Sequence, residues 1–318
     1  MNNVALLCGG FSRESVISYR SAALVEKSLS DVNVYKIHIV EEGWYYEHNG
    51  VKIAVDKNDF SLTIDGQKIT FDYVYNFIHG SPGEDGLLSG YFEMLGISQS
   101  GSSTFASSLT FNKGMCNAFL RSHGIRVSNS IILYKDEDWN AQLDQISYPC
   151  FVKPNNGGSS IGNSRVNKPE DLHPALSLAF EHDDEIIVED FVGGREFTCG
   201  VVEYQGKIEA LAVSEVIVNA EFFDFDQKYS ENGAIEVTPA EIDDELRDEI
   251  MRLTERVFRL LKLKNMGRVD FIHNGKELVL IEVNTIPGFS DKSFLPQMLA
   301  YRKIPVGDLL KEFRKADI

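Results

Sequence analysis

The sequence predicts an α/β protein, with α+β parts, whose N-terminal third forms a doubly wound parallel sheet. Its 318 residues exceed the roughly 100–200 residues at which a single hydrophobic core stops growing, so two or three domains are expected. Strand and helix signals alternate through the first third of the chain, a pattern that favours parallel strands with helices on both faces. A Ser/Gly-rich stretch at 98–103 then marks a boundary.

The first unit is expected to open with a buried strand at 4–8 and a helix at 13–29, which Ser12 is placed to cap. Two more strands are expected at 34–39 and 73–78. Short extended pieces and one further helix complete this unit, at 51–55, 61–70 and 86–95.

After the boundary, a smaller α+β unit and a second large unit are expected. The smaller unit would begin with one helix that runs to about residue 123, and its other elements are expected at 130–134, 139–146, 150–154, 170–182 and 185–190. The last unit would hold four strands and one charged helix, at 196–202, 207–213, 243–261, 267–273 and 278–283. A polar, aromatic-rich loop at 220–233 is a candidate lid.

Charge and composition exclude several classes of partner. The formal net charge is −17, so the surface repels nucleic acid and anionic membranes, and we expect neither as a partner. No segment approaches the roughly 18 apolar residues of a membrane span, and the apolar run at 4–8 is too short for a signal peptide, so we expect a cytoplasmic protein. The four cysteines lack metal-ligand or CxxC spacing and are expected to be buried, reduced thiols.

A glycine- and serine-rich loop at 155–162 follows Lys153 at the end of an expected strand. Glycines let backbone N–H groups approach phosphate oxygens, and the hydroxyls of Ser159 and Ser160 add donors. The loop has neither the GK[ST] ending of a Walker A motif nor the spacing of a dinucleotide fingerprint. On composition alone, phosphate binding and a plain flexible loop are about equally supported.

A second candidate site lies on the last two expected strands. Glu282 and Asn284 are two residues apart on one strand, so they share a face, and their oxygens suit Mg²⁺. Asp270 joins them only if the residue numbers of paired positions in the hairpin sum to an even value. The alternative is a surface hairpin with solvated charges.

The connection between these two strands therefore decides whether a metal site forms. A three-residue connection at 273–275 would give the even register and would bring Arg268 to the same face. A two-residue Asn274-Gly275 turn would instead send Asp270 to the opposite face.

Three further segments fit ligand binding but are ambiguous alone. HGSPGEDG at 79–86 follows an apolar strand, where ligands bind in open α/β sheets, yet it also fits a simple turn before a helix. In LCGGFSRE at 7–14, Glu14 equally fits a charge that favours a helix N-terminus. VEDFVGGREFT at 188–198 brackets a tight linker with acids that could accept hydrogen bonds from a nucleotide.

Taken together and in order, these segments resemble the D-alanine–D-alanine ligases. The matches run from Gly9 to Phe294 and comprise LCGGFSRE, HGSPGEDG, FVKPNNGGSSIG, VEDFVGGREFT, KYS, GRVDF and IEVNTIPGFS. The resemblance implies a three-domain ATP-grasp fold with ATP held between the second and third domains. The expected domains are an N-terminal substrate domain at 1–103, a central ATP-grasp domain at 104–190 and a C-terminal catalytic domain at 191–318.

The resemblance also implies which residues would bind ATP and metal. Glu189 would meet the adenine amino group and Glu196 the ribose. The remaining nucleotide and phosphate contacts would come from Lys113, Lys153, Ser159, Ser160 and Lys228. Two Mg²⁺ ions, which Mn²⁺ could replace, would be held by Asp270, Glu282 and Asn284.

Substrate contacts are implied in the same way. Glu14 would lie near the ammonium of the first D-alanine, in a network with Ser159 and Tyr229, and His79 near its acyl group. Arg268 would stabilise the developing negative charge. The carboxylate of the second D-alanine would be held at Ser293 and Phe294, with backbone N–H groups near Gly288 forming an oxyanion site.

The implied activity is ATP-dependent ligation of two D-alanines through D-alanyl phosphate, for peptidoglycan precursor synthesis. Tyr229 favours an amine acceptor, because relatives that make D-alanyl-D-lactate tend to carry another residue there. The sequence departs from the usual pattern at 155–157, which bears on loop closure, and at 290–293, which bears on the acceptor site. A ligase of the same fold with another acceptor, such as D-lactate or another amino acid, is the alternative. A homodimer is implied by the resemblance alone.

Two rival classes fit the sequence less well. A regulator that binds ATP without turnover would have no need of the intact set of metal ligands. An oxidoreductase of the Rossmann type would carry GxGxxG after the strand at 4–8, and this chain does not.

Overall fold

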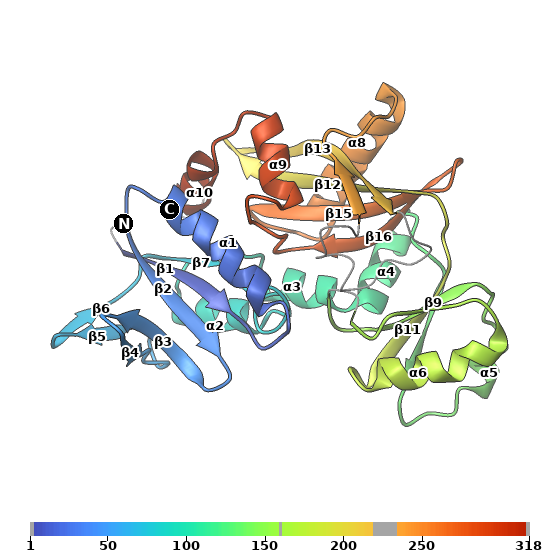
Figure 1. Ribbon diagram of the computed structural model, residues 1–318, viewed down its shortest axis with the longest axis horizontal. Helices are drawn as coiled ribbons and strands as arrows, with labels where there is room; N and C mark the ends of the chain where they lie inside the picture. Colours follow the sequence, from blue (N-terminus) through green and yellow to red (C-terminus); the bar gives the residue numbers. More distant parts are fainter. Residues whose placement is uncertain (1–2, 159–160, 219–233, 316–318) are drawn as a thin grey trace.

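The computed structural model describes residues 3–158, 161–218 and 234–315, which form three main sheets with flanking helices (Figure 1). The first sheet has the strand order β4-β3-β2-β1-β7. Its strands are β1 (Asn3–Gly9), β2 (Asn33–Val40), β3 (Gly43–His48), β4 (Val51–Ala54) and β7 (Tyr73–Asn76). β1 pairs in parallel with both β2 and β7, as predicted, whereas β3 and β4 add antiparallel strands at one edge.

Helices cover both faces of this first sheet, which confirms the doubly wound arrangement. Side chains alternate along β1, so Val4 and Leu6 pack with α1 (Ser15–Ser28) and α10 (Val306–Lys315). Ala5 and Leu7 pack on the other face with α2 (Leu87–Leu95). A separate two-stranded ribbon pairs β5 (Leu62–Ile64) with β6 (Gln67–Ile69).

The start of α1 differs from the prediction. The helix begins at Ser15 with Glu14 at the N-cap position, and no side chain caps it. Ser12 instead accepts a hydrogen bond from the Glu14 N–H (3.2 Å) in the turn that precedes the helix. The consequence for the site is that Glu14, rather than Ser12, stands where the loop meets the helix.

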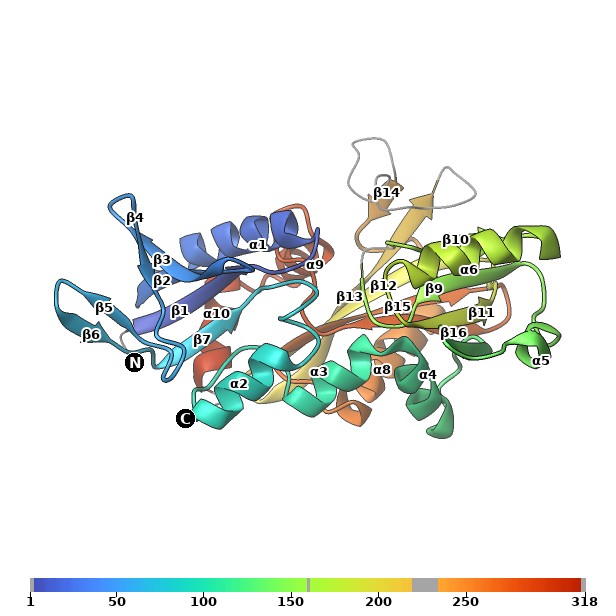
Figure 2. The same ribbon diagram turned by 90° about the horizontal axis from the view of Figure 1, so that it is seen from below.

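The region after the boundary is also more broken than predicted. Instead of one helix there are two, α3 (Thr104–Phe111) and α4 (Lys113–Ser122), which follow α2 along one side of the molecule (Figure 2). Asn112 leaves the helical conformation and its side chain accepts a hydrogen bond from the Met115 N–H, so it caps α4. This break makes Lys113 the first residue of a new helix.

The second sheet is antiparallel, with the order β10-β9-β11-β8. Its strands are β8 (Ser130–Tyr134), β9 (Cys150–Pro154), β10 (Ser164–Val166) and β11 (Glu185–Asp190). One face packs on α6 (Leu172–Phe180), which follows a single 3₁₀ turn (Pro169–Asp171). The short α5 (Asn140–Leu143) is all that forms of the helix expected at 139–146.

The third sheet is antiparallel, with the order β14-β13-β12-β15-β16. Its strands are β12 (Arg195–Tyr204), β13 (Lys207–Val218), β14 (Ala234–Val237), β15 (Met266–His273) and β16 (Leu278–Asn284). The long helix α8 (Asp244–Leu260) covers one face. The shorter α9 (Phe294–Tyr301) packs on the other face, against Gly200 and Leu211.

One hydrophobic core joins the first sheet to the third. It contains Leu6 of β1, Val202 of β12, Leu299 of α9 and Phe313 of α10, all buried. All four cysteines are buried and unpaired by disulfides, as predicted. Within the part of the chain that the structure describes, we find no helix with the length and apolar character that a membrane crossing requires.

Candidate active site

The β15–β16 hairpin has the register that a metal site needs. Asp270 pairs with Glu282, and Arg268 pairs with Asn284, so all four side chains lie on one face of the third sheet. The even register is therefore confirmed. The predicted three-residue connection at 273–275 is wrong. The connection is four residues long, 274–277, and the residue numbers of the pairs nearest the turn sum to an odd value.

A β-bulge corrects the register inside the hairpin. Phe271 pairs with Leu280, and the next pair is Asp270 with Glu282, so Ile281 is an extra residue on β16. Without this extra residue, the straight ladder would place Ile281 opposite Asp270 and would turn Glu282 to the other face. The bulge thus aims the Glu282 and Asn284 side chains at the site.

The Asp270 carboxylate is fixed by three neighbouring side chains. Arg268 donates two hydrogen bonds to it, from Nε (3.0 Å) and Nη2 (2.9 Å). Asn284 Nδ2 donates at 3.1 Å, and the hydroxyl of buried Thr198 on β12 donates at 2.5 Å. Two carboxylates and an amide oxygen on one face are the donor set that Mg²⁺ prefers, so the residues present fit the implied ion.

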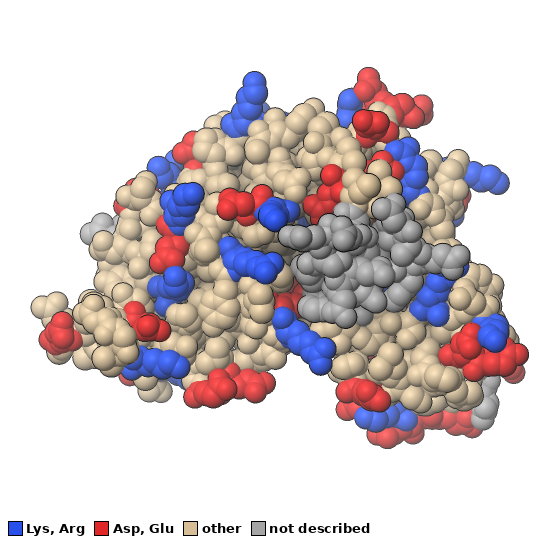
Figure 3. Space-filling view, viewed as in Figure 1, with Lys and Arg blue, Asp and Glu red and all other residues tan. Residues whose placement is uncertain are grey.

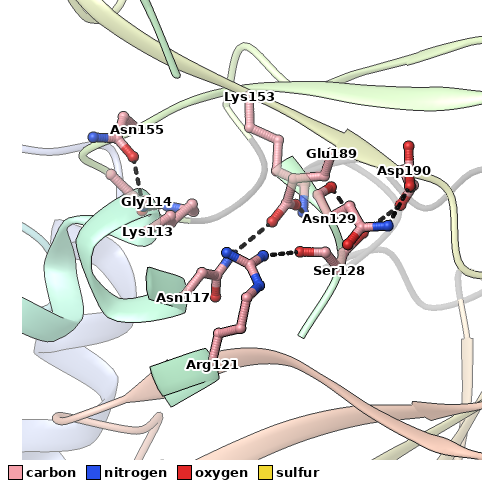
Figure 4. A network of polar contacts seen from close by, with 11 residues as sticks. Lys113, Gly114, Asn117, Arg121, Ser128, Asn129, Lys153, Asn155, Glu189 and Asp190 are labelled. Carbon is pink, nitrogen blue, oxygen red and sulfur yellow. Dashed lines mark hydrogen bonds and ion pairs between the residues drawn. The ribbon is translucent and has the colours of Figure 1, made fainter. Parts of the chain in front are cut away.

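Two residues that the resemblance implies for the nucleotide, Lys153 for phosphate and Glu189 for the adenine amino group, meet on the second sheet (Figure 4). Lys153 Nζ on β9 donates to Glu189 Oε2 on β11 at 2.6 Å, and Asn117 Nδ2 on α4 donates to Glu189 Oε1 at 2.9 Å. Burial alone would lower the pKa of Lys153, but the Glu189 carboxylate outweighs it and the pKa is raised. Lys153 therefore stays a charged donor to Glu189.

The start of α4 is tied to the glycine-rich loop. The backbone N–H groups of Lys113 and Gly114 donate to the carbonyl (3.0 Å) and side chain (2.8 Å) of Asn155, which is fully buried. The Lys113 ammonium donates to the Gly157 carbonyl. Burial lowers the pKa of Lys113, and the nearby Glu282 carboxylate offsets this only in part. Asn155 is thus a fixed anchor of the loop, which composition alone did not reveal.

A cavity brings these groups together with the first sheet. Its walls include Glu14, Lys113, Gly158, Glu282 and Asn284. The Glu14 carboxylate packs closely on Gly158, because a Cβ added to Gly158 would lie 3.0 Å from Glu14 Oε2. Residues from the three main parts of the chain therefore converge on one small volume.

The cavity also contains a carboxyl group that the sequence analysis did not single out, that of Glu84. Its oxygens accept hydrogen bonds from the N–H groups of Gly80 (2.8 Å) and Ile286 (3.2 Å). Burial, followed by the neighbouring Glu14 charge, raises the pKa of Glu84 to about 8, against the lowering effect of the two N–H donors. Glu84 thus links the loop after β7 to the loop after β16.

The residues implied for the second substrate lie beside Arg268. Ser293 Oγ accepts from the Ser290 N–H (3.0 Å) and lies close to Gly288, where an added Cβ would be 3.0 Å from it. The Arg268 guanidinium is 6.0 Å from the Phe294 ring centroid. Arg268, Gly288, Ser293 and Phe294 therefore form one neighbourhood at the start of α9.

Glu196 and His79, which the resemblance also implies, lie on different parts of the structure. Glu196 pairs with Ile272 and lies on the same face of the third sheet as Thr198 and Asp270. His79 is buried, and both of its ring nitrogens contact protein atoms, Ile286 O at 2.9 Å and Ser21 Oγ at 3.1 Å. Ser159, Ser160, Lys228 and Tyr229, and the candidate lid at 220–233, lie outside the described residues.

Sequence reasoning missed four residues that hold these groups in place, Thr198, Asn117, Glu84 and Ser21. Two had a usable signal: Thr198 is two residues after Glu196 on a strand, and Asn117 is four residues after Lys113 on a helix. Glu84 lies within the segment HGSPGEDG, but its bond to Ile286 and the bond of Ser21 to Phe289 join distant parts of the chain and had no signal in the sequence.

Charged side chains of both signs lie on the face seen in Figure 3. Several Lys and Arg side chains lie across its middle beside a few acidic ones, and further acidic and basic side chains lie at its edge. With a formal net charge of −17, the chain needs local positive groups such as Lys113 and Lys153 to hold an anionic ligand.

Two adjoining antiparallel sheets, one with Lys153 and the other with the Asp270 and Glu282 carboxylates, are typical of the ATP-grasp class of ATP-dependent ligases. Residues 3–102 match the family model described as D-ala D-ala ligase N-terminus, and residues 119–313 match the one described as D-ala D-ala ligase C-terminus. The chain belongs to the D-alanine–D-alanine ligase family.

Individual relatives agree with this placement. The chain is 40% identical over 314 residues to a D-alanine–D-alanine ligase of Flavobacterium johnsoniae, covering 97% of both chains. It is 39% identical to one of Bacteroides fragilis, covering 98% of this chain and 97% of that one.

Solved structures are equally similar in fold. D-alanyl-alanine synthetase A from Vibrio cholerae superposes with a TM-score of 0.90 at 29% identity, covering 99% of this chain and 98% of that one. The VanG D-Ala:D-Ser ligase from Enterococcus faecalis also gives a TM-score of 0.90, at 28% identity, covering 100% of this chain and 99% of that one.

Proposed function

We propose that this chain joins two D-alanines to D-alanyl-D-alanine through a D-alanyl phosphate intermediate, with ATP converted to ADP and phosphate. The observation that carries the proposal is the shared face of Arg268, Asp270, Glu282 and Asn284, with Gly288 and Ser293 beside it. This arrangement can hold phosphate groups and an acyl group at the same place. The product would serve peptidoglycan precursor synthesis.

The first step would activate a carboxylate, which is a poor acyl donor because its leaving group would be oxide. A carboxylate oxygen of the first D-alanine attacks the γ-phosphorus of ATP, and the bond to ADP breaks. Lys153 on the second sheet and Lys113 at the start of α4 face the phosphates, and their charges oppose the repulsion between two anions. Two Mg²⁺ ions, or Mn²⁺ in their place, would supply further charge neutralisation when held by Asp270, Glu282 and Asn284.

The second step would form the amide bond. The neutral amine of the second D-alanine attacks the carbonyl carbon, and the bond from that carbon to the phosphate oxygen breaks with its electron pair going to phosphate. The nitrogen gives up one proton, which the released phosphate can take. Arg268 meets the oxygen that gains negative charge, together with the backbone N–H near Gly288. Because Arg268 makes a bidentate bond with Asp270, that carboxylate also sets the direction of the guanidinium.

Glu14 would bind the ammonium of the first D-alanine. Its carboxylate lies in the cavity beside Gly158, and the resemblance adds Ser159 and Tyr229 to its network. Glu189 would accept from the adenine amino group, Glu196 would bind the ribose, and Ser160 and Lys228 would contact phosphate. Phe294 and Ser293 would hold the carboxylate of the second D-alanine.

Purified protein with MgATP tests the activity. D-alanine should release ADP and an equal amount of the dipeptide, and L-alanine should release neither. D-lactate and D-serine, each offered with D-alanine, test the alternative acceptors, and the D-Ala:D-Ser neighbour makes D-serine the more pointed comparison. If D-alanine alone released no ADP, the proposal would be wrong.

The oligomeric state, location and domain boundaries of the enzyme are also proposed. The family resemblance supports a homodimer in the cytoplasm, and the net charge of −17 supports an enzyme that binds neither nucleic acid nor anionic membranes. Light scattering at micromolar concentration would test the dimer. The predicted division at 1–103, 104–190 and 191–318 would be tested by limited proteolysis.

A further inference from the structure

A closed chain of hydrogen bonds connects α1, the loop after β7 and the loop after β16. The Phe289 N–H donates to Ser21 Oγ at 3.1 Å, and Ser21 Oγ lies 3.1 Å from His79 Nε2. His79 Nδ1 lies 2.9 Å from the carbonyl oxygen of Ile286. The chain thus begins and ends on one short backbone segment, 286–289, and Gly288 lies inside that segment.

The direction of each bond follows from the groups involved. A carbonyl oxygen only accepts, so His79 Nδ1 must carry the proton that meets Ile286. Burial lowers the pKa of His79 to about 4, so the ring is neutral and Nε2 is an acceptor. The Ser21 hydroxyl therefore donates its hydrogen to His79 Nε2 and accepts a hydrogen bond from the Phe289 N–H.

The segment is buried and held at further points. Ser21, Phe289 and Ile286 are 0%, 0% and 2% exposed, so water has little access to replace a lost bond. The Ile286 N–H also donates to Glu84 Oε1 (3.2 Å), and the Phe289 ring packs on Phe77 with centroids 5.0 Å apart. With both ends fixed, the Gly288 N–H between them has a defined direction.

We propose that Ser21 is a positioning residue for the amide-forming step, because through His79 and Phe289 it fixes the segment that carries the Gly288 N–H. This inference rests on the proposed function, in which that N–H meets the developing oxyanion. Ser21 touches neither substrate in this account. It acts through the backbone that it holds.

The variant Ser21→Ala removes the link and leaves the His79 Nε2 and the Phe289 N–H without their partner. A misdirected donor near the reacting atom costs on the order of 10²-fold, so kcat for dipeptide formation should fall by about that factor. The KM for ATP should stay within about threefold, because the chain lies away from Lys153 and Glu189. The ratio of dipeptide to ADP should fall below one, since the acyl phosphate would have more time to hydrolyse.

Ser18→Ala is the matched control. Ser18 lies one turn earlier on α1, is equally buried, and bonds Gly9 and Phe77 instead of the 286–289 segment. It should lower the melting temperature without changing the ratio of dipeptide to ADP. If Ser21→Ala does not fold, Ser21→Cys keeps the shape with a weaker donor and should show an intermediate loss of coupling.

A measurement independent of turnover separates this inference from the proposed function. In ¹⁵N spectra of histidine-labelled protein, assigned with a His79→Gln variant, His79 should be neutral and protonated at Nδ1, and its Nε2 signal should shift in Ser21→Ala. If wild-type protein makes dipeptide but Ser21→Ala matches Ser18→Ala in kcat and coupling, the positioning role is refuted. If His79 is protonated at Nε2, the chain itself is refuted whether or not the enzyme turns over.

Discussion

Replacing Thr198 by Val tests how the carboxylate of Asp270, a proposed metal ligand, is held. Thr198 on β12 faces Asp270 on β15, and its hydroxyl donates to Asp270 Oδ1 at 2.5 Å from a buried position. Val has nearly the same shape and cannot donate, so the change removes this bond and little else. Arg268 and Asn284 would then hold the carboxylate without it.

Two estimates of the magnitude agree. A hydrogen bond to a charged group contributes about 1.5–3 kcal/mol. Losing a partner that orients a metal ligand typically costs about 10–100-fold in metal affinity or activity, which corresponds to about 1.4–2.8 kcal/mol. We therefore expect the Mg²⁺ concentration for half-maximal activity of Thr198→Val to rise by about 10–100-fold.

The assay is ADP release against Mg²⁺ concentration at saturating D-alanine, with thermal unfolding as a check on the fold. Thr198→Ser keeps the hydroxyl and is the matched control, with an expected shift of less than about threefold. An unchanged Mg²⁺ curve for the Val variant would show that the Thr198 hydroxyl does not hold Asp270 for metal binding. An equal shift for the Ser variant would do the same, because packing would then explain the effect.

The remaining predictions concern charge, nucleotide and pH. Glu282→Gln should abolish ADP release while the melting temperature stays close to wild type, because it removes a ligand charge from a partly exposed position; near-normal turnover would count against the metal assignment. Asn117→Leu removes a donor to Glu189 and should raise the KM for ATP by about 10-fold with a smaller change in kcat, measured by ADP release; a kcat effect alone would contradict it. Because the pKa of His79 is lowered to about 4, its contribution to stability is complete above pH 6.5 and is lost as the pH falls toward 4. Urea unfolding at pH 7.5 and 5 should therefore show wild type losing about 2 kcal/mol more than His79→Asn, and equal losses would contradict it.

Local pattern predicted the parts of the fold that local physics determines. β1 is a short apolar run buried on both faces, which is the signature of a central parallel strand, and it pairs as expected with β2 and β7. The shared face of Glu282 and Asn284 follows from strand geometry alone. These features need no knowledge of distant residues.

The missed elements depend on contacts between distant residues. The bulge at Ile281 depends on pairing within the sheet around it. The sequence therefore showed that Asp270 joins Glu282 and Asn284 only in the even register, but it did not show which register the hairpin adopts. β3, β14, α9 and α10 were not predicted, and α10 packs on β1 from the other end of the chain. The break at Asn112 had a signal, an N-cap residue inside an apolar pattern, that was not used.

The candidate site shows the same division. Residue types that bind phosphate and metal were recognisable, because lysines, glycines and carboxylates occur in ordered motifs. The residues that position them were not, because Ser21 and Glu84 act on a segment more than 200 positions away, as their bonds to Phe289 and Ile286 show. Which side chain orients another is a property of the folded structure.

In the proposed reaction, this site activates D-alanine as an acyl phosphate before the amide bond forms. The most direct measurement uses D-alanine labelled with ¹⁸O in its carboxylate, unlabelled MgATP, and mass spectrometry of the released phosphate. The account predicts one ¹⁸O atom in each phosphate, because the oxygen that attacks the γ-phosphorus leaves with it when the amine displaces phosphate. Phosphate without ¹⁸O, in a reaction that still makes the dipeptide, would contradict it.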